Sequence, residues 1–138
     1  MNHWLLKTEP SEYSYEDLER KGHGVWDGVA NNLALIHLRQ MKKGDLALIY
    51  HTGDEKAVVG VATVASNPYP DPKANDPKLV VVEVQPKRRL ARPVSLAELK
   101  ADPDFQDFAL VKISRLSVMP VERDRFKKLL ALGKAAAR

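Results

Sequence analysis

Apolar residues along the chain gather into short, nearly continuous runs. Four of these runs predict β-strands, at residues 3–7, 45–51, 57–65 and 78–85. The second is apolar at almost every position, as in a strand that is covered on both faces. Gly60 interrupts the third run, and it predicts a bulge or a tight bend in a curved sheet.

Polar residues at helix starts predict two helices between these runs. Ser14 precedes Asp17 by three residues, a capping-box pattern, and the helix it opens should stop near Gly22. Asn31 is a suitable cap for a second helix that runs to about Met41. We expect this second helix to be heavily buried, because its apolar face is broad. Ala34, Leu38 and Met41 share this face with Leu35 beside them, and Leu33 and Ile36 widen it.

The C-terminal part of the chain adds three further elements. Ser95 and Glu98 form a capping-box pattern that opens a short helix. Residues 109–121 predict a broken strand. Residues 122–133 predict an amphipathic helix whose apolar face includes Phe126, with Gly133 just past its C-terminus.

These elements predict one α+β domain over residues 1–138, with a frayed tail at 134–138. The regular alternation of helices and strands that a doubly wound parallel sheet needs is absent. We therefore expect a small curved β-barrel of about five strands, flanked by three or four short helices. A loop at 66–77 contains four prolines and is expected to be irregular but stiff. Strand alternation places Trp4 in the core.

Composition narrows the classes of function. The chain has no cysteine, which excludes disulfides, thiolate metal sites and thiol nucleophiles. We expect a soluble, cytoplasmic, monomeric protein, because no long apolar run and no signal-peptide pattern is present. The formal net charge of +4 weakly favours polyanions. Lys87, Arg88, Arg89 and Arg92 form a basic cluster that is either a phosphate-contact patch or a solvated strand end.

Signatures of catalysis are missing. The sequence contains no glycine-rich phosphate loop, no GxSxG elbow and no histidine spacing typical of a metal site. We therefore expect no catalytic residues, no metal and no cofactor.

Polar side chains follow directly after several apolar runs. Lys7, Thr8 and Glu9 end the first strand, and Tyr50, His51 and Thr52 end the second; Trp26 and Asp27 precede the buried helix. If these ends converge, they form a cleft with an aromatic wall and a polar rim, which suits a flat heteroaromatic ligand. The alternative is that Trp26 is a core residue and Asp27 only a turn or cap residue.

The order of motifs along the chain resembles that of the EVE domain family of the PUA-like superfamily. The resemblance lies in WLLKTEPSEYS (4–14), VWDGVANN (25–32), LRQMKKGDLALIYHT (38–52), GVATV (60–64), YPDP (69–72), PVSLAELK (93–100) and RLSVMPV (115–121). It implies a PUA-like β-barrel and a role as a reader of modified bases. By similarity to the related YTH domains, Trp26 would be a wall of an aromatic cage.

The same resemblance implies roles for the neighbouring residues and includes one departure. Asp27 and Asn31 would contact the edge of the base, with Lys7, Thr8, Glu9, Tyr50, His51 and Thr52 nearby. The family usually carries arginine at the positions of Ala30 and Leu35. Losing two arginines removes two strong anion contacts, which puts backbone binding by that helix in question.

Three hypotheses follow. In the first, the protein is a non-catalytic module that takes a modified base of DNA or RNA, single-stranded or flipped, into a Trp26-walled pocket. Lys87, Arg88 and Arg89 would hold phosphates. In the second, it binds or converts a modified nucleoside or other small molecule in the same cleft, with His51 or Glu9 as acid or base. In the third, the barrel surface or the Phe126 helix binds a protein.

Overall fold

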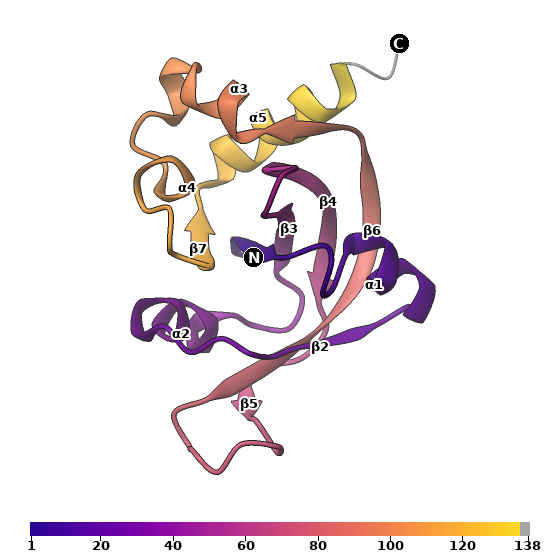
Figure 1. Cartoon of the computed structure of the whole chain (residues 1–138), viewed down its shortest axis with the longest axis vertical. Coiled ribbons are helices and arrows are strands. Elements are labelled where there is room, and N and C mark those ends of the chain that lie inside the picture. Colours follow the sequence, from indigo (N-terminus) through magenta and orange to yellow (C-terminus); the bar gives the residue numbers. More distant parts are fainter. Residues whose placement is uncertain (136–138) are drawn as a thin grey trace.

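The computed structural model describes residues 1–135, and its centre is a mixed sheet of seven strands that curls into a half-barrel (Figure 1). The strand order is β2-β6-β4-β3-β1-β7, with β5 paired to β6 beside this path. The strands are β1 His3–Thr8, β2 Gly24–Trp26, β3 Leu46–His51, β4 Ala57–Val64, β5 Tyr69–Pro70, β6 Val80–Ser95 and β7 Val118–Val121. Only β1 and β3 are parallel, and every other pair is antiparallel.

Five α-helices and one 3-10 turn flank the sheet. They are α1 Tyr15–Lys21, α2 Asn32–Gln40, α3 Leu96–Lys100, the 3-10 turn Pro103–Phe105, α4 Ala109–Lys112 and α5 Arg123–Ala135. Helices α3, α4 and α5 gather at one end of the half-barrel, whereas α2 and the β5 loop lie at the other (Figure 1). The predicted α+β class and curved sheet are confirmed, with seven strands rather than about five.

Local sequence signals act where they were expected. The Ser14 hydroxyl accepts from the Asp17 N–H, and the Asp17 carboxylate accepts from the Ser14 N–H, which completes the capping box of α1. Ser95 and Glu98 form the same reciprocal pair at α3. The Asn31 side chain caps α2 by accepting from the Ala34 N–H.

Gly60 marks a break in the register of β4, as predicted. The pairing of β4 with β6 shifts between Val58 and Gly60. A Cβ added at Gly60 would lie 2.6 Å from the ring of Tyr15, which is fully buried and donates to the Val61 carbonyl. The missing side chain therefore lets α1 press its tyrosine against the bend of the sheet.

Four predictions for individual elements were wrong or incomplete. Strand β6 continues through the basic cluster to Ser95, because a second register shift between Val61 and Ala62 accommodates Pro86 opposite Ala62. Residues 109–112 form a helix rather than a strand, and the buried Phe108 and Leu110 dock this turn against the core. Helix α2 buries only one face, which leaves Leu33 and Ile36 exposed.

The fourth difference concerns the end of the chain. Gly133 lies inside α5, where it packs closely against Leu90; an added Cβ would stand 3.0 Å from that side chain. The predicted frayed tail at 134–138 begins within this helix, and residues 136–138 lie outside the described part of the chain. Within residues 1–135, no helix has the length and apolar character needed to cross a membrane.

Candidate functional site

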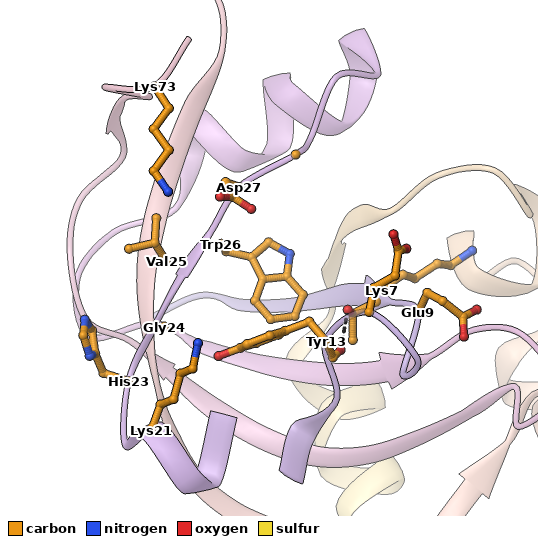
Figure 2. Close-up of a pocket in the computed structure, with 13 residues that line it drawn as sticks. Lys7, Glu9, Tyr13, Lys21, His23, Gly24, Val25, Trp26, Asp27 and Lys73 are labelled. Carbon is orange, nitrogen blue, oxygen red and sulfur yellow. Dashed lines mark hydrogen bonds between the residues drawn. The ribbon is translucent and has the colours of Figure 1, made fainter. Parts of the chain in front are cut away.

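A cleft of about 760 Å³ opens between the end of β1, the loop that leads into α1, and strand β2 (Figure 2). Two segments of the chain, residues 7–13 and 21–28, line most of it, and Lys73 comes from the loop between β5 and β6. The lining residues are Lys7, Thr8, Glu9, Glu12, Tyr13, Lys21, His23, Gly24, Val25, Trp26, Asp27, Gly28 and Lys73. The structure thus brings together five of the predicted site residues, namely Lys7, Thr8, Glu9, Trp26 and Asp27.

Trp26 belongs both to the core and to the cleft. Its backbone pairs with Val82 of β6, and only 7% of its surface is exposed. Tyr13 stands edge-on to the indole, with ring centroids 6.1 Å apart and an interplanar angle of 81°. The two rings therefore form an aromatic corner at the wall of the cleft.

Tyr13 is held by its backbone rather than by its hydroxyl. The Thr8 hydroxyl donates to the Tyr13 carbonyl at 2.7 Å. The Tyr13 hydroxyl is buried and has no hydrogen-bond partner within residues 1–135, and burial raises the pKa of this phenol. It lies so close to Gly24 that an added Cβ there would stand 2.5 Å from it. A buried hydroxyl group without a hydrogen-bond partner costs free energy, so the position of the Tyr13 ring is not a strongly stabilised one.

The charged residues of the cleft differ in how firmly they are held. The Lys7 ammonium donates to the Ser114 carbonyl at 2.8 Å, and burial lowers its pKa. The Glu9 carboxylate accepts from the backbone and the hydroxyl of Ser11, and these hydrogen bonds lower its pKa. Asp27 is exposed and has no hydrogen-bond partner in the described part of the chain. Asp27, like the exposed Glu12 of the same cleft, is therefore a carboxylate that remains available to a ligand.

The other predicted ligand contacts do not line this cleft. Asn31 caps α2, and Tyr50 is buried in the core. The Thr52 hydroxyl contacts Glu9 Oε2 at 3.3 Å, while the Thr52 N–H donates to the Thr8 carbonyl. Thr52 therefore supports the wall of the cleft from behind.

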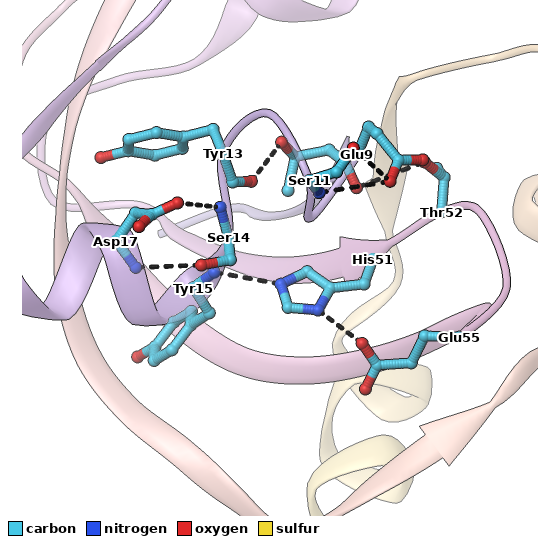
Figure 3. A network of polar contacts seen from close by, with 10 residues as sticks. Glu9, Ser11, Tyr13, Ser14, Tyr15, Asp17, His51, Thr52 and Glu55 are labelled. Atoms are coloured by element: carbon cyan, nitrogen blue, oxygen red, sulfur yellow. Dashed lines mark hydrogen bonds and ion pairs between the residues drawn. The ribbon is translucent and has the colours of Figure 1, made fainter.

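His51 joins helix α1 to the hairpin between β3 and β4 (Figure 3). Its Nε2 accepts from the Tyr15 N–H at 3.0 Å, and its Nδ1 lies 2.7 Å from Glu55 Oε1. Because Nε2 accepts, Nδ1 carries the proton and donates it to the carboxylate. His51 and Glu55 line a separate cavity of about 260 Å³, together with Arg89.

The basic cluster lies on β6 and does not line the cleft of Trp26. Arg89 pairs with Glu19 at 2.5 Å and stacks over the Tyr15 ring at 5.5 Å. Arg92 pairs with Glu98. Lys87 and Arg88 are exposed. Two of the four cations are therefore already paired within the protein.

Sequence reasoning did not single out Tyr13, Lys21, His23 or Lys73 as site residues. Tyr13 stands inside the quoted motif WLLKTEPSEYS, which is a signal that could have found it. Lys21 and His23 lie just before the VWDGVANN motif but outside it, and Lys73 is distant in sequence and reaches the cleft only through the fold. Within residues 1–135, no cluster of three or more acidic or histidine side chains is placed to hold a metal ion.

Comparison with known proteins identifies the family. Residues 2–132 match the EVE domain. Thymocyte nuclear protein 1 of Mus musculus is 33% identical over 165 residues, which cover 95% of this chain and 73% of the relative. The solved structure of a Rhodopseudomonas palustris protein has a TM-score of 0.91 at 39% identity, and the match covers 96% of this chain and 93% of that one.

A third match includes a ligand. The crystal structure of the human THYN1 protein in complex with DNA that contains 5-methylcytosine has a TM-score of 0.88 at 30% identity, and the match covers 96% of this chain and 98% of that one. These structures confirm the PUA-like α+β fold that the motif order implied. By the length and strength of these matches, the chain belongs to the EVE domain family.

Proposed function

We propose that this protein is a non-catalytic module that binds nucleic acid and accepts one modified base in the cleft beside Trp26. The observation that carries the proposal is the aromatic corner of Tyr13 and Trp26 with Asp27 at its rim. The complex of its human relative with DNA containing 5-methylcytosine supports this class of ligand and makes 5-methylcytosine the first base to test.

The aromatic corner sets how a base enters. Because Trp26 is only 7% exposed, a base that stacks on the indole must take the place of the Tyr13 ring. That exchange removes a hydroxyl from a place where it has no partner within residues 1–135. Stacking on an aromatic side chain contributes about 1–3 kcal/mol per base.

The rim of the cleft provides a contact for the base edge. Asp27 is exposed and without a protein partner among the described residues, so its carboxylate is free to accept from an exocyclic amino group. Acidic side chains accept from cytosine N4 in this way. A methylated cytosine would then present its amino group to Asp27 and its methyl group to the aromatic corner.

Two observations favour binding over catalysis. Both ring nitrogens of His51 are engaged, and this residue lines the other cavity. Hydrogen bonds from Ser11 lower the pKa of Glu9, whereas a general acid needs a raised pKa. Glu9 lines the cleft, but its lowered pKa makes it a poor general acid, and His51 does not line the cleft.

The test is a fluorescence titration with 12-nucleotide single-stranded DNAs that carry one 5-methylcytosine or one cytosine. We expect tighter binding of the methylated strand. Asp27→Ala should weaken that binding by about 1–3 kcal/mol, the typical worth of a base-edge contact. Asp54→Ala is the matched control, since Asp54 is an exposed aspartate in the turn after β3. Equal affinities for both strands would contradict the proposal.

The relatives do not test three expectations: the kind of ligand, the location of the protein and phosphate binding by the β6 cluster. A free nucleoside is the alternative ligand, because the cleft volume lies within the range of small-molecule sites. Saturation by 5-methyldeoxycytidine alone, at the affinity of the oligonucleotide, would favour that reading. The relatives are named nuclear proteins, so a cytoplasmic location stays a prediction, as does phosphate binding by Lys87, Arg88 and Arg89.

A further inference from the structure

Two lysines line the cleft near opposite ends of β2. In Figure 2, Lys21 approaches the Tyr13 ring from one end of the strand, and Lys73 points toward Val25 and Asp27 from the other. The Lys21 ammonium lies 5.9 Å from the centroid of Tyr13. Both lysines line the cleft and both are exposed or partly exposed.

Neither lysine side chain is committed to an ion pair in the described part of the chain. Within residues 1–135, neither ammonium has a carboxylate within ion-pair distance. The arginines of the β6 cluster differ, since Arg89 pairs with Glu19 and Arg92 pairs with Glu98. A lysine that is not paired keeps its full charge for an external anion.

The surface between the two lysines is open and mixed in character. Strand β2 is at the edge of the sheet, and its outward residue Val25 is 45% exposed. His23, just before the strand, is exposed as well. The inward residue of β2, Trp26, forms the aromatic corner together with Tyr13. The strand therefore presents an apolar residue outward, between two lysines that belong to neighbouring segments, beside the place where a base would enter.

We propose that a single nucleic-acid strand lies along β2, with its phosphates at Lys21 and Lys73 on either side of the base that turns toward Trp26. This inference rests on the proposed function and assigns the phosphate contacts to these lysines instead of the β6 cluster. A single strand is the fitting partner, because turning a base outward costs least where it is unpaired.

The experiment measures how affinity for the 12-nucleotide strand depends on salt. Each phosphate contact to a single strand contributes about 0.7 to the slope of log affinity against log salt concentration. The double variant Lys21→Gln/Lys73→Gln should therefore lower the slope by about 1.4, and Lys73→Gln alone by about 0.7. The single variant keeps Lys21 beside Tyr13 and so leaves the aromatic corner unchanged.

Two controls fix the interpretation. Lys127→Gln removes an exposed lysine from α5, at the far end of the half-barrel, and should leave the slope unchanged (Figure 1). Lys87→Gln/Arg88→Gln removes two cations of the β6 cluster. A wild-type slope in the Lys21 and Lys73 variants would overturn the inference, and so would a slope that falls only in the β6 variant.

The experiment distinguishes failure of this inference from failure of the proposed function. If the methylated and unmethylated strands bind equally, the proposed function fails. A fall in slope in the lysine variants would still support the phosphate contacts. If the methyl preference is present and the slope is unchanged in these variants, only the strand path is overturned. A duplex of the same sequence that binds more tightly than the single strand would also overturn it.

Discussion

At the scale of single residues, Asp45 shows how a buried charge is fixed. Its carboxylate is 4% exposed and accepts from the Trp4 indole N–H at 2.9 Å, the Asn2 N–H at 3.1 Å and the Lys42 N–H at 3.0 Å. Three donors converge on one acidic group and join β1 to the start of β3. The Asp45 side chain therefore stabilises the junction of these strands, a role that its predicted place in a turn did not indicate.

We predict that Asp45→Asn destabilises the fold by about 1–3 kcal/mol. The amide nitrogen of asparagine cannot accept a hydrogen bond, so at least one of the three N–H donors would lose its acceptor. Urea unfolding, followed by the fluorescence of Trp4 and Trp26, measures the change. An unchanged midpoint would show that the amide finds other partners.

Gly60 gives a second prediction at this scale. Gly60→Ala should lower the free energy of unfolding by about 1–3 kcal/mol, because the new methyl group meets the fully buried Tyr15 ring at 2.6 Å. Gly22→Ala is not a neutral control, since φ there is +76°. The smallest expected cost is ~1 kcal/mol, so a loss below about 0.5 kcal/mol would mean that the Tyr15 ring shifts aside without penalty.

At the scale of elements, His51 secures the loop that carries Tyr13. Its Nε2 is the only acceptor for the Tyr15 N–H within residues 1–135, and Thr52 beside it holds Thr8 and Glu9. The hairpin between β3 and β4 thus supports one wall of the cleft without lining it. This explains how residues predicted as ligand contacts serve as its supports.

We predict that His51→Leu frees this wall. The Tyr15 N–H would lose its partner, and the stability should fall by about 1–3 kcal/mol. Hydrogen exchange should accelerate at residues 11–18 more than at β4. His51→Gln, which retains an acceptor, should recover part of the protection. Uniform acceleration over the whole chain would contradict a local role.

Helix α3 gives a prediction for pH. Hydrogen bonds from Arg92, together with the Ser95 N–H, hold the pKa of Glu98 below its ordinary value of 4.5. A lowered pKa in the folded state means that the ionised group adds stability above the unfolded pKa, and that this stability is lost as pH falls. The urea midpoint of the wild type should exceed that of Glu98→Gln at pH 7. The gap should close as pH falls through and below 4.5.

At the scale of the whole molecule, the sheet is strongest in its middle and open at its edges. Strands β3, β4 and β6 have neighbours on both sides, whereas β2 pairs through three residues with β6 alone. Native-state hydrogen exchange should therefore be slowest in β4 and much faster in β2. Binding of the methylated strand should slow exchange in β2 selectively. Equal protection of β2 and β4 in the free protein would contradict this order.

Local signals allowed much of the fold to be predicted, and long-range packing explains the rest. The capping boxes at Ser14 and Ser95 and the break at Gly60 depend on a few neighbouring residues, so the sequence reveals them. The passage of β6 through Pro86 depends on a register shift in its partner strand, which no local pattern encodes. Trp26 lies in a recognisable local motif and was predicted at the cleft, whereas Lys73 reaches the cleft only through the fold and was not predicted.

The position of β1 in the sheet bears on how the protein is made. Strand β1, at residues 3–8, pairs with β7, at residues 118–121, so the first and last strands of the chain are neighbours. A chain leaving the ribosome cannot close this pairing until β7 has emerged. Folding of such long-range contacts is slow. One edge of β1 must therefore stay unpaired through most of synthesis, although the other edge can pair with β3 much earlier. Chaperones that bind nascent chains would find this open edge.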